Sequence, residues 1–194
     1  MIGFLRGTLT VKQPPRMLVE VGGVGYEVDA PMSTFYRLPK TGSEVTLYTH
    51  LMVREDTQVL FGFATEAERT LFRSLIRVNG IGARLALAIL SGLSTEEFQR
   101  CVQQGDALSL QRLPGIGKKT AERLIVELRD RLPESLRPSL TVDEATDPVR
   151  EAQAALMALG YKPQEAQRLL EQVNGKAEAV EDLIRLALKA AGGQ

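Results

Sequence analysis

The stretch of sequence that decides the fold is LPGIGKKTA, residues 113–121. A second copy, VNGIGARLA, occupies residues 78–86, 35 positions earlier. In both copies an apolar residue and Asn or Pro precede Gly-Ile-Gly, and a basic residue and an alanine follow. Each copy also follows one apolar helical pattern and precedes another. The repeat therefore predicts two pairs of helices, each pair joined by the same tight turn.

The residue types in the repeat suit a turn that binds phosphate. The two glycines of each copy let the backbone turn tightly and remove the Cβ atoms that would hold a ligand away, while the isoleucine anchors the turn in the core. Main-chain N–H groups at the start of the second helix then face outward, where unpaired donors and the positive helix end favour an anion. Arg84, Lys118 and Lys119 add mobile charge beside them. This is the helix-hairpin-helix pattern, and it indicates contacts with the DNA backbone rather than with the bases.

Other interpretations of these glycines are weaker. A Gly-Ile-Gly turn can simply join two packed helices, but such turns rarely repeat with a basic residue at the same offset. No stretch has the spacing of a G-x-x-x-x-G-K-[ST] nucleotide-binding loop, and neither the turns nor residues 22–25 (GGVG) complete G-x-G-x-x-G. We therefore expect no ATP or dinucleotide cofactor.

Residues 1–64 alternate in short β-type runs. Five strands are predicted, at residues 2–11, 17–21, 24–30, 44–53 and 57–63. Two glycines at residues 22–23 mark a hairpin between the second and third strands, and RED at residues 54–56 marks one between the fourth and fifth. With a longer crossing at residues 31–41, the pattern suits a small Greek-key barrel of the OB type, although a generic five-stranded barrel predicts the same pattern.

The rest of the chain has helical patterns, with one interruption. Residues 65–132 carry five of them, at residues 66–78, 83–90, 96–104, 107–112 and 118–131. Residues 133–148 hold three prolines and four acids, which predicts a flexible linker. Three more helices are predicted at residues 149–159, 163–173 and 177–190. Their leucines, Leu159 included, predict a small core, and a bundle of this size suits a docking module.

Composition limits the function classes. The chain has 24 Lys+Arg and 24 Asp+Glu, a formal net charge of +0, which excludes a uniformly basic DNA or membrane binder. By segment, residues 65–132 hold 11 basic and 8 acidic residues, and residues 133–194 hold 7 basic and 10 acidic residues, so positive charge gathers in the hairpin segment.

The chain has one cysteine, Cys101, which we expect to be a small buried residue, and one histidine, His50, which we expect to lie on a strand. A single cysteine and a single histidine do not supply the ligands of a metal site, so we expect none. No long apolar run follows the N-terminus, so we expect a cytoplasmic chain without a membrane partner.

Glu55 and Asp56 form an acidic pair at the tip of a predicted hairpin. Two acids at such a tip are usually a solvated turn. A metal-binding nuclease pair would need further converging carboxylates, and the sequence does not identify them. A third use of the pair is repulsion of a phosphate backbone.

Taken together, these motifs resemble the RuvA family, whose members are DNA-binding subunits of Holliday junction branch-migration complexes. The resemblance covers essentially the whole chain, and residues 113–131 are its most diagnostic part. It is carried by MIG (1–3), GGVGY (22–26), RED (54–56), LFGF (60–63), ERTLF (68–72), both hairpins and LGY (159–161). It implies an α+β multidomain fold. The expected parts are an OB-like barrel at residues 1–64, a tandem helix-hairpin-helix domain at 65–132, a linker at 133–148 and a three-helix, UBA-like bundle at 149–194.

The resemblance also implies site residues and partners. Family members form a homotetramer, or two tetramers, around an open, square-planar four-way junction. The hairpins would bind duplex phosphates through Asn79, Gly80, Gly82, Ala83, Arg84, Gly115, Gly117, Lys118, Lys119 and Thr120. Glu55 and Asp56 would form an acidic pin at the junction centre, with basic Arg54 beside them. Leu159 and Tyr161 would be candidates for docking the RuvB hexameric ATPase, and the RuvC junction resolvase is a further expected partner.

The predicted function is therefore non-catalytic binding of four-way DNA junctions in recombination, DNA repair and the SOS response. The first hairpin is expected to rely more on backbone donors, because Ala83 lacks the charge of Lys118. The alternative is a helix-hairpin-helix DNA-repair nuclease or glycosylase, for which the sequence offers no identifiable catalytic set. A second alternative is a structural adaptor whose hairpins simply pack together.

Overall fold

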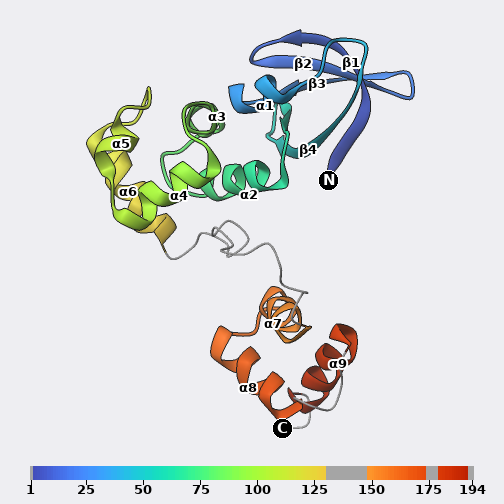
Figure 1. Cartoon of the computed structure of the whole chain (residues 1–194), viewed down its shortest axis with the longest axis vertical. Helices are drawn as coiled ribbons and strands as arrows, with labels where there is room; N and C mark the ends of the chain where they lie inside the picture. The colour runs from blue at the N-terminus through green and yellow to red at the C-terminus, as the bar shows by residue number, and fades with distance from the viewer. Residues whose placement is uncertain (1, 130–147, 174–178, 192–194) are drawn as a thin grey trace. The chain divides into compact units, whose positions relative to one another are not determined.

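The structure is a computed structural model that describes residues 2–129, 148–173 and 179–191. The described residues fall into two compact units, each treated by itself. The first runs to Arg129 and the second begins at Pro148 (Figure 1). The linker predicted at residues 133–148 lies outside the described residues except for Pro148, which opens a helix. The predicted domain boundaries stay predictions.

The first unit opens with a closed five-stranded barrel, which confirms the predicted OB-like architecture. The strands run in the order β1-β2-β3-β5-β4, and β1 pairs with both β2 and β4 to close the barrel. Only β3 and β5 pair in parallel, at Asp29 and Phe61. The strands are β1 (Phe4–Gln13), β2 (Arg16–Val21), β3 (Val24–Asp29), β4 (Glu44–Val53) and β5 (Gln58–Phe63).

The alternation of the strands explains the barrel core. Every second side chain of β1 and β2 points inward, so Leu9, Met17 and Val19 are buried while their neighbours are exposed or half-buried. His50 lies on β4, as predicted. Its ring contacts Phe72 edge-on at 5.7 Å between centroids, so the outer face of this strand packs on the helices that follow.

A short helix, α1 (Met32–Arg37), occupies the crossing between β3 and β4 and was not predicted. Six residues with two aromatics and a threonine are too short for a periodic pattern to appear in the sequence. The main-chain N–H of Met32 donates to Ser91 Oγ at 2.9 Å. Buried Thr34 donates to the Glu68 carboxylate at 3.3 Å. The helix therefore joins the barrel to the helices of the same unit (Figure 1).

Five helices complete the first unit, as the sequence pattern predicts. They are α2 (Glu66–Leu75), α3 (Ala83–Gly92), α4 (Thr95–Gln104), α5 (Ala107–Gln111) and α6 (Lys118–Arg129). Their core is continuous with the barrel, because Phe61 and Phe63 of β5 lie 5.0 and 4.9 Å from the ring of Phe72. Cys101 is only partly buried, against the expectation of a fully buried residue, because it lies at the edge of this core.

The second unit is a bundle of α7 (Pro148–Ala158), α8 (Pro163–Val173) and α9 (Val180–Ala191). Its core is apolar and includes Leu156, Leu170 and Leu183. The expectation that Leu159 joins this core is wrong, since its side chain is 62% exposed. Leu159 follows the end of α7, so it no longer shares the helical face that buries Leu156.

Candidate nucleic-acid interface

The two Gly-Ile-Gly turns have the same backbone geometry. Gly80 and Gly115 have φ values of +87° and +83°, in the left-handed region that side chains other than glycine rarely adopt. The isoleucines that follow, Ile81 and Ile116, are each 5% exposed. Each turn is closed by an N–H of the isoleucine, which donates to the carbonyl of Val78 or Leu113 at 3.0 and 3.2 Å. The tight turn predicted at the first glycine and the predicted burial of the isoleucine are therefore both observed.

The second glycine of each turn, Gly82 or Gly117, immediately precedes a helix, and the N-terminus of that helix is open. Ala86 N–H donates to Gly82 O and Ala121 N–H to Gly117 O, each at 3.0 Å, so these bonds start α3 and α6. The N–H groups of the three residues after each glycine therefore precede the first helical bond. A glycine has no side chain that could cap them, and a Cβ at either glycine would meet no atom within 4 Å. These donors therefore stay open to a ligand.

Neighbouring helices of the same unit begin differently. Thr65 before α2 and Ser94 before α4 each form a complete capping box, and Asp106 before α5 accepts from Ser109 N–H at 3.0 Å. A side-chain cap satisfies the donors that an anion would otherwise bind. Within one unit, the capped helix starts are thus distinct from the two glycine starts, where a phosphate can take the place of the cap.

The charged side chains predicted for the site surround these helix starts. Arg84, Lys118 and Lys119 are exposed. Asn79 and the four glycines of the two turns are exposed as well, whereas Ala83 and Thr120 are half-buried. The open N–H groups and the mobile cations together form a surface that can hold phosphate oxygens without reading a base.

Arg123 of α6 connects the two hairpins through a hydrogen bond. This residue is not among the site residues predicted from the sequence. Its Nη1 donates to the carbonyl of Asn79 in the first turn at 3.0 Å. Leu85 of the first hairpin packs against the second turn, so that a Cβ at Gly115 would lie 3.2 Å from its Cδ1. The helical period could have indicated that Arg123 lies near the turns, because Arg123 is one helical turn after Lys119 on the same face of α6.

A groove of about 530 Å³ connects the first hairpin to the barrel. Gly82, Ala83 and Arg84 line it from α3, and Arg54 lines it from the end of the β4–β5 hairpin. Arg16 and Asp29 of β2 and β3 complete its charged lining. The structure thus brings the predicted Arg54 to the first Gly-Ile-Gly turn, although 28 positions separate Arg54 from Gly82 in the sequence.

Glu55 and Asp56 lie at the exposed tip of the same β4–β5 hairpin. Arg54 N–H donates to Thr57 O at 2.8 Å and closes the tip, and Asp56 accepts from Thr57 Oγ1 at 3.3 Å. Neither acid lines the groove. Both carboxylates therefore extend into solvent.

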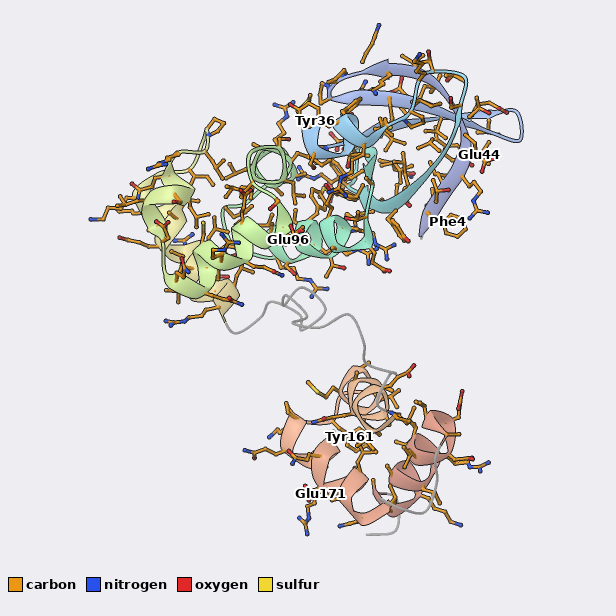
Figure 2. All side chains as sticks on the ribbon, viewed as in Figure 1. Phe4, Tyr36, Glu44, Glu96, Tyr161 and Glu171 are labelled. Carbon is orange, nitrogen blue, oxygen red and sulfur yellow. The ribbon has the colours of Figure 1, made fainter. Side chains whose placement is uncertain are left out.

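The docking candidates of the second unit differ in burial. Leu159 is largely exposed, and Tyr161 packs partly on the bundle core (Figure 2). Gly160 between them has a φ of +102°, which turns the chain after α7. Met157, near the end of α7, is a further apolar side chain that is partly exposed, at 45%.

Metal clusters and membrane-spanning helices are both absent from the described residues. No group of three or more His, Cys, Asp or Glu side chains in them is placed to hold a metal ion. None of their helices has the length and apolar character needed to cross a membrane.

The barrel, the paired turns and the open helix starts define a tandem helix-hairpin-helix protein built on an OB-like barrel. Comparison with known families agrees in each part. The RuvA N-terminal domain matches residues 1–62, a SAM-like helix-hairpin-helix tandem matches 72–130, and the RuvA C-terminal domain matches 147–192.

Curated relatives match over nearly the full chain. The relative from Thioalkalivibrio sulfidiphilus is 62% identical and covers 98% of this chain and 98% of its own length. The relative from Methylococcus capsulatus is 59% identical and covers 98% of this chain and 99% of its own length. That of Pseudomonas aeruginosa is 53% identical over 97% of this chain and 98% of its own. Each is named Holliday junction branch migration complex subunit RuvA. The chain belongs to the RuvA family, which confirms the family resemblance and the fold class.

Proposed function

We propose that this chain is the non-catalytic, junction-binding subunit of a branch-migration complex. The observation that carries the proposal is the pair of glycine-started helices, α3 and α6, whose N-termini are open while those of α2, α4 and α5 are capped by side chains. An open helix start suits a phosphate, and two of them in one chain suit a duplex backbone. The names of the relatives point to the same function.

The proposed phosphate contacts come from both hairpins. Main-chain N–H groups after Gly82 and Gly117 bind phosphate oxygens directly, and Arg84, Lys118 and Lys119 add charge. Asn79, Gly80 and Gly115 shape the turns, while Ala83 and Thr120 contribute the N–H groups of the first helical turns. Because these contacts read no base edges, the binding is independent of sequence and strongly dependent on salt.

The junction preference is proposed to come from the tip of the β4–β5 hairpin. In a fourfold assembly the exposed acids Glu55 and Asp56 of each chain would meet at the centre and repel a continuous duplex. Arg54, which lines the groove of the first hairpin, would hold a phosphate next to that centre. Self-association is supported by apolar side chains exposed on the first unit, Phe4 at 59% and Tyr36 at 77% (Figure 2).

The second unit is proposed to dock the motor. The relatives are named as subunits of a branch migration complex, and the family resemblance implies the RuvB hexameric ATPase as the partner in that complex. The exposed side chains of Leu159 and Met157, next to Tyr161, form an apolar edge suited to such a contact. The RuvC resolvase is a further proposed partner, acting on the same junction. Bacterial chromosomal junctions lie in the cytoplasm, where we expect the chain to act.

The test is a competition between a four-way junction and a linear duplex of the same sequence for the purified chain, with the solution mass measured in parallel. The proposal expects preferential binding of the junction by a tetramer or by two tetramers, without cleavage when Mg²⁺ is added. Cleavage would favour the nuclease alternative, which the names of the relatives do not favour. Absence of DNA binding at low salt would favour the adaptor.

A further inference from the structure

Arg16, at the start of β2, lies at the groove between the barrel and the first hairpin. Its Nε donates to Asp29 Oδ1 at 3.0 Å, and its Nη1 lies 3.3 Å from Glu27 Oε2. Both acids belong to β3, the neighbouring strand, and Asp29 is the register partner of Arg16. Despite the two ion pairs the Arg16 side chain is 60% exposed.

The groove gathers three arginines from three parts of the chain. Arg16 comes from β2, Arg54 from the β4–β5 hairpin and Arg84 from the first turn of α3. Asp29 is the acid among the lining residues, so the charged lining carries three positive groups and one negative group. Arg16 and Arg84 also line a second hollow, of about 480 Å³, that continues between β3, α1 and α3. The positive lining therefore extends from the hairpin onto the barrel.

We propose that Arg16 is a further DNA-contacting residue, which extends the phosphate track of the first hairpin onto the barrel. The inference rests on the proposed function, since it assumes that DNA occupies the first hairpin. A guanidinium carries five N–H donors in a planar fork and can bind carboxylate and phosphate at the same time. Asp29 and Glu27 engage the Nε and Nη1 of Arg16, and the hydrogen bond from Arg16 within the described residues leaves from Nε rather than from Nη2. The acids thus orient the group, and the Nη2 edge meets the phosphate.

A simpler role for Arg16 is a pair of cross-strand ion pairs that only stabilise the barrel and neutralise Asp29 and Glu27. Exposed pairs of this kind contribute little to stability. In that case Arg16 would affect DNA binding only through the charges of Asp29 and Glu27, and removal of all three groups together would cancel the effect. Direct binding of phosphate predicts that the effect of removing Arg16 persists when Asp29 and Glu27 are also neutral.

The test uses the full chain and a four-way junction, with the dissociation constant measured across a range of salt. Three variants are compared: Arg16→Gln, an acid variant that combines Asp29→Asn with Glu27→Gln, and the triple variant that carries all three changes. The control is Arg6→Gln, at an exposed arginine of β1 that does not line the groove. Arg16→Gln is expected to weaken binding severalfold and to reduce the slope of log K against log salt by about 0.9 for each phosphate that the variant no longer binds. Arg6→Gln is expected to leave both values unchanged. Thermal unfolding of each variant shows that the barrel is intact.

The triple variant decides between the two roles. If it binds more weakly than the acid variant and keeps the reduced slope, Arg16 contacts DNA directly. Equal binding by the triple variant and the acid variant would overturn the assignment, as would an unchanged slope for Arg16→Gln. A wild-type chain that shows no junction binding, with Lys118→Ala equally inactive, would instead overturn the proposed function itself.

Discussion

The guanidinium of Arg123 on α6 donates a hydrogen bond of 3.0 Å to the main-chain carbonyl of Asn79 in the first hairpin turn. The helix that follows the second Gly-Ile-Gly turn therefore also contacts the first turn. The two turns are connected by this hydrogen bond and by the packing of Leu85 against Gly115.

Replacing Arg123 with Leu, which retains an apolar stem, is expected to lower the free energy of unfolding by about 1 kcal/mol. The same change should speed amide hydrogen exchange in the first turn, at Gly80 and Ile81, because the Asn79 carbonyl no longer has its donor. Exchange measured by mass spectrometry tests this. Arg129→Leu, at the exposed end of the same helix, is the matched control. Equal exchange in both variants would show that Arg123 does not hold the turn.

A side-chain cap introduced at Gly82 should compete with phosphate. Its φ of −85° and ψ of 168° suit any residue, and an Asp or Asn there would accept from the Leu85 N–H. Gly82→Asn is expected to stabilise the fold by a few tenths of a kcal/mol and to weaken junction binding. Gly82→Asp should weaken it further, by roughly tenfold or more, through repulsion.

The matched control for the introduced cap is Ser94→Gly, which opens a capped helix start away from the turns. It should destabilise the fold and leave junction binding unchanged. Stronger binding by Gly82→Asn would contradict the open helix start as the phosphate site.

Replacing Lys118 and Lys119 with Ala should weaken binding to junction and linear duplex alike, because the proposed function assigns both lysines to phosphate rather than to bases. The slope of log K against log salt is expected to fall by about 0.9 for each phosphate released from the interface. Fluorescence anisotropy at several salt concentrations measures both values. Lys12→Ala on β1 serves as the control variant. An affinity equal to that of the wild type would remove the two lysines from the site.

Neutralising the hairpin tip with Glu55→Gln and Asp56→Asn is expected to relax the preference for a junction over a duplex. The physical reason is that the carboxylates no longer repel a continuous backbone. Both acids are exposed, so stability should change by less than about 0.5 kcal/mol. A competition between junction and duplex tests the ratio. A ratio that stays at the wild-type value would return the pair to the role of a solvated turn.

His50 should make the first unit less stable at mildly acidic pH. Burial and the nearby Arg73, Arg69 and Arg77 lower its pKa below the ordinary 6.5. The unfolded chain then binds more protons than the folded chain once the pH falls below about 6.5, so the free energy of unfolding decreases. Denaturant unfolding at about pH 7.5 and about pH 5.5 measures the change. His50→Gln, which can still accept from Arg73, should show a smaller decrease, and an equal decrease would exclude His50 as the cause.

Local pattern predicted most of the elements, because strands and helices can be recognised by their period. The five strands and the helices at Glu66, Ala83 and Lys118 follow from alternation and from the repeat. The helix α1 did not, since six residues cannot show a period. Leu159 was misplaced for a related reason, because a leucine one residue past a helix end no longer follows that helix's face.

The sequence by itself determined the two Gly-Ile-Gly turns. Their glycines, isoleucines and cations act through backbone conformation and residue type within nine consecutive positions, and so they can be recognised from spacing alone. Tertiary structure alone decided what surrounds them. Arg123 reaches Asn79 across 44 positions, and Arg16 and Arg54 meet Arg84 in one groove only because the barrel and α3 pack on a shared core. Contacts between distant segments depend on how elements pack, and no local period records that packing.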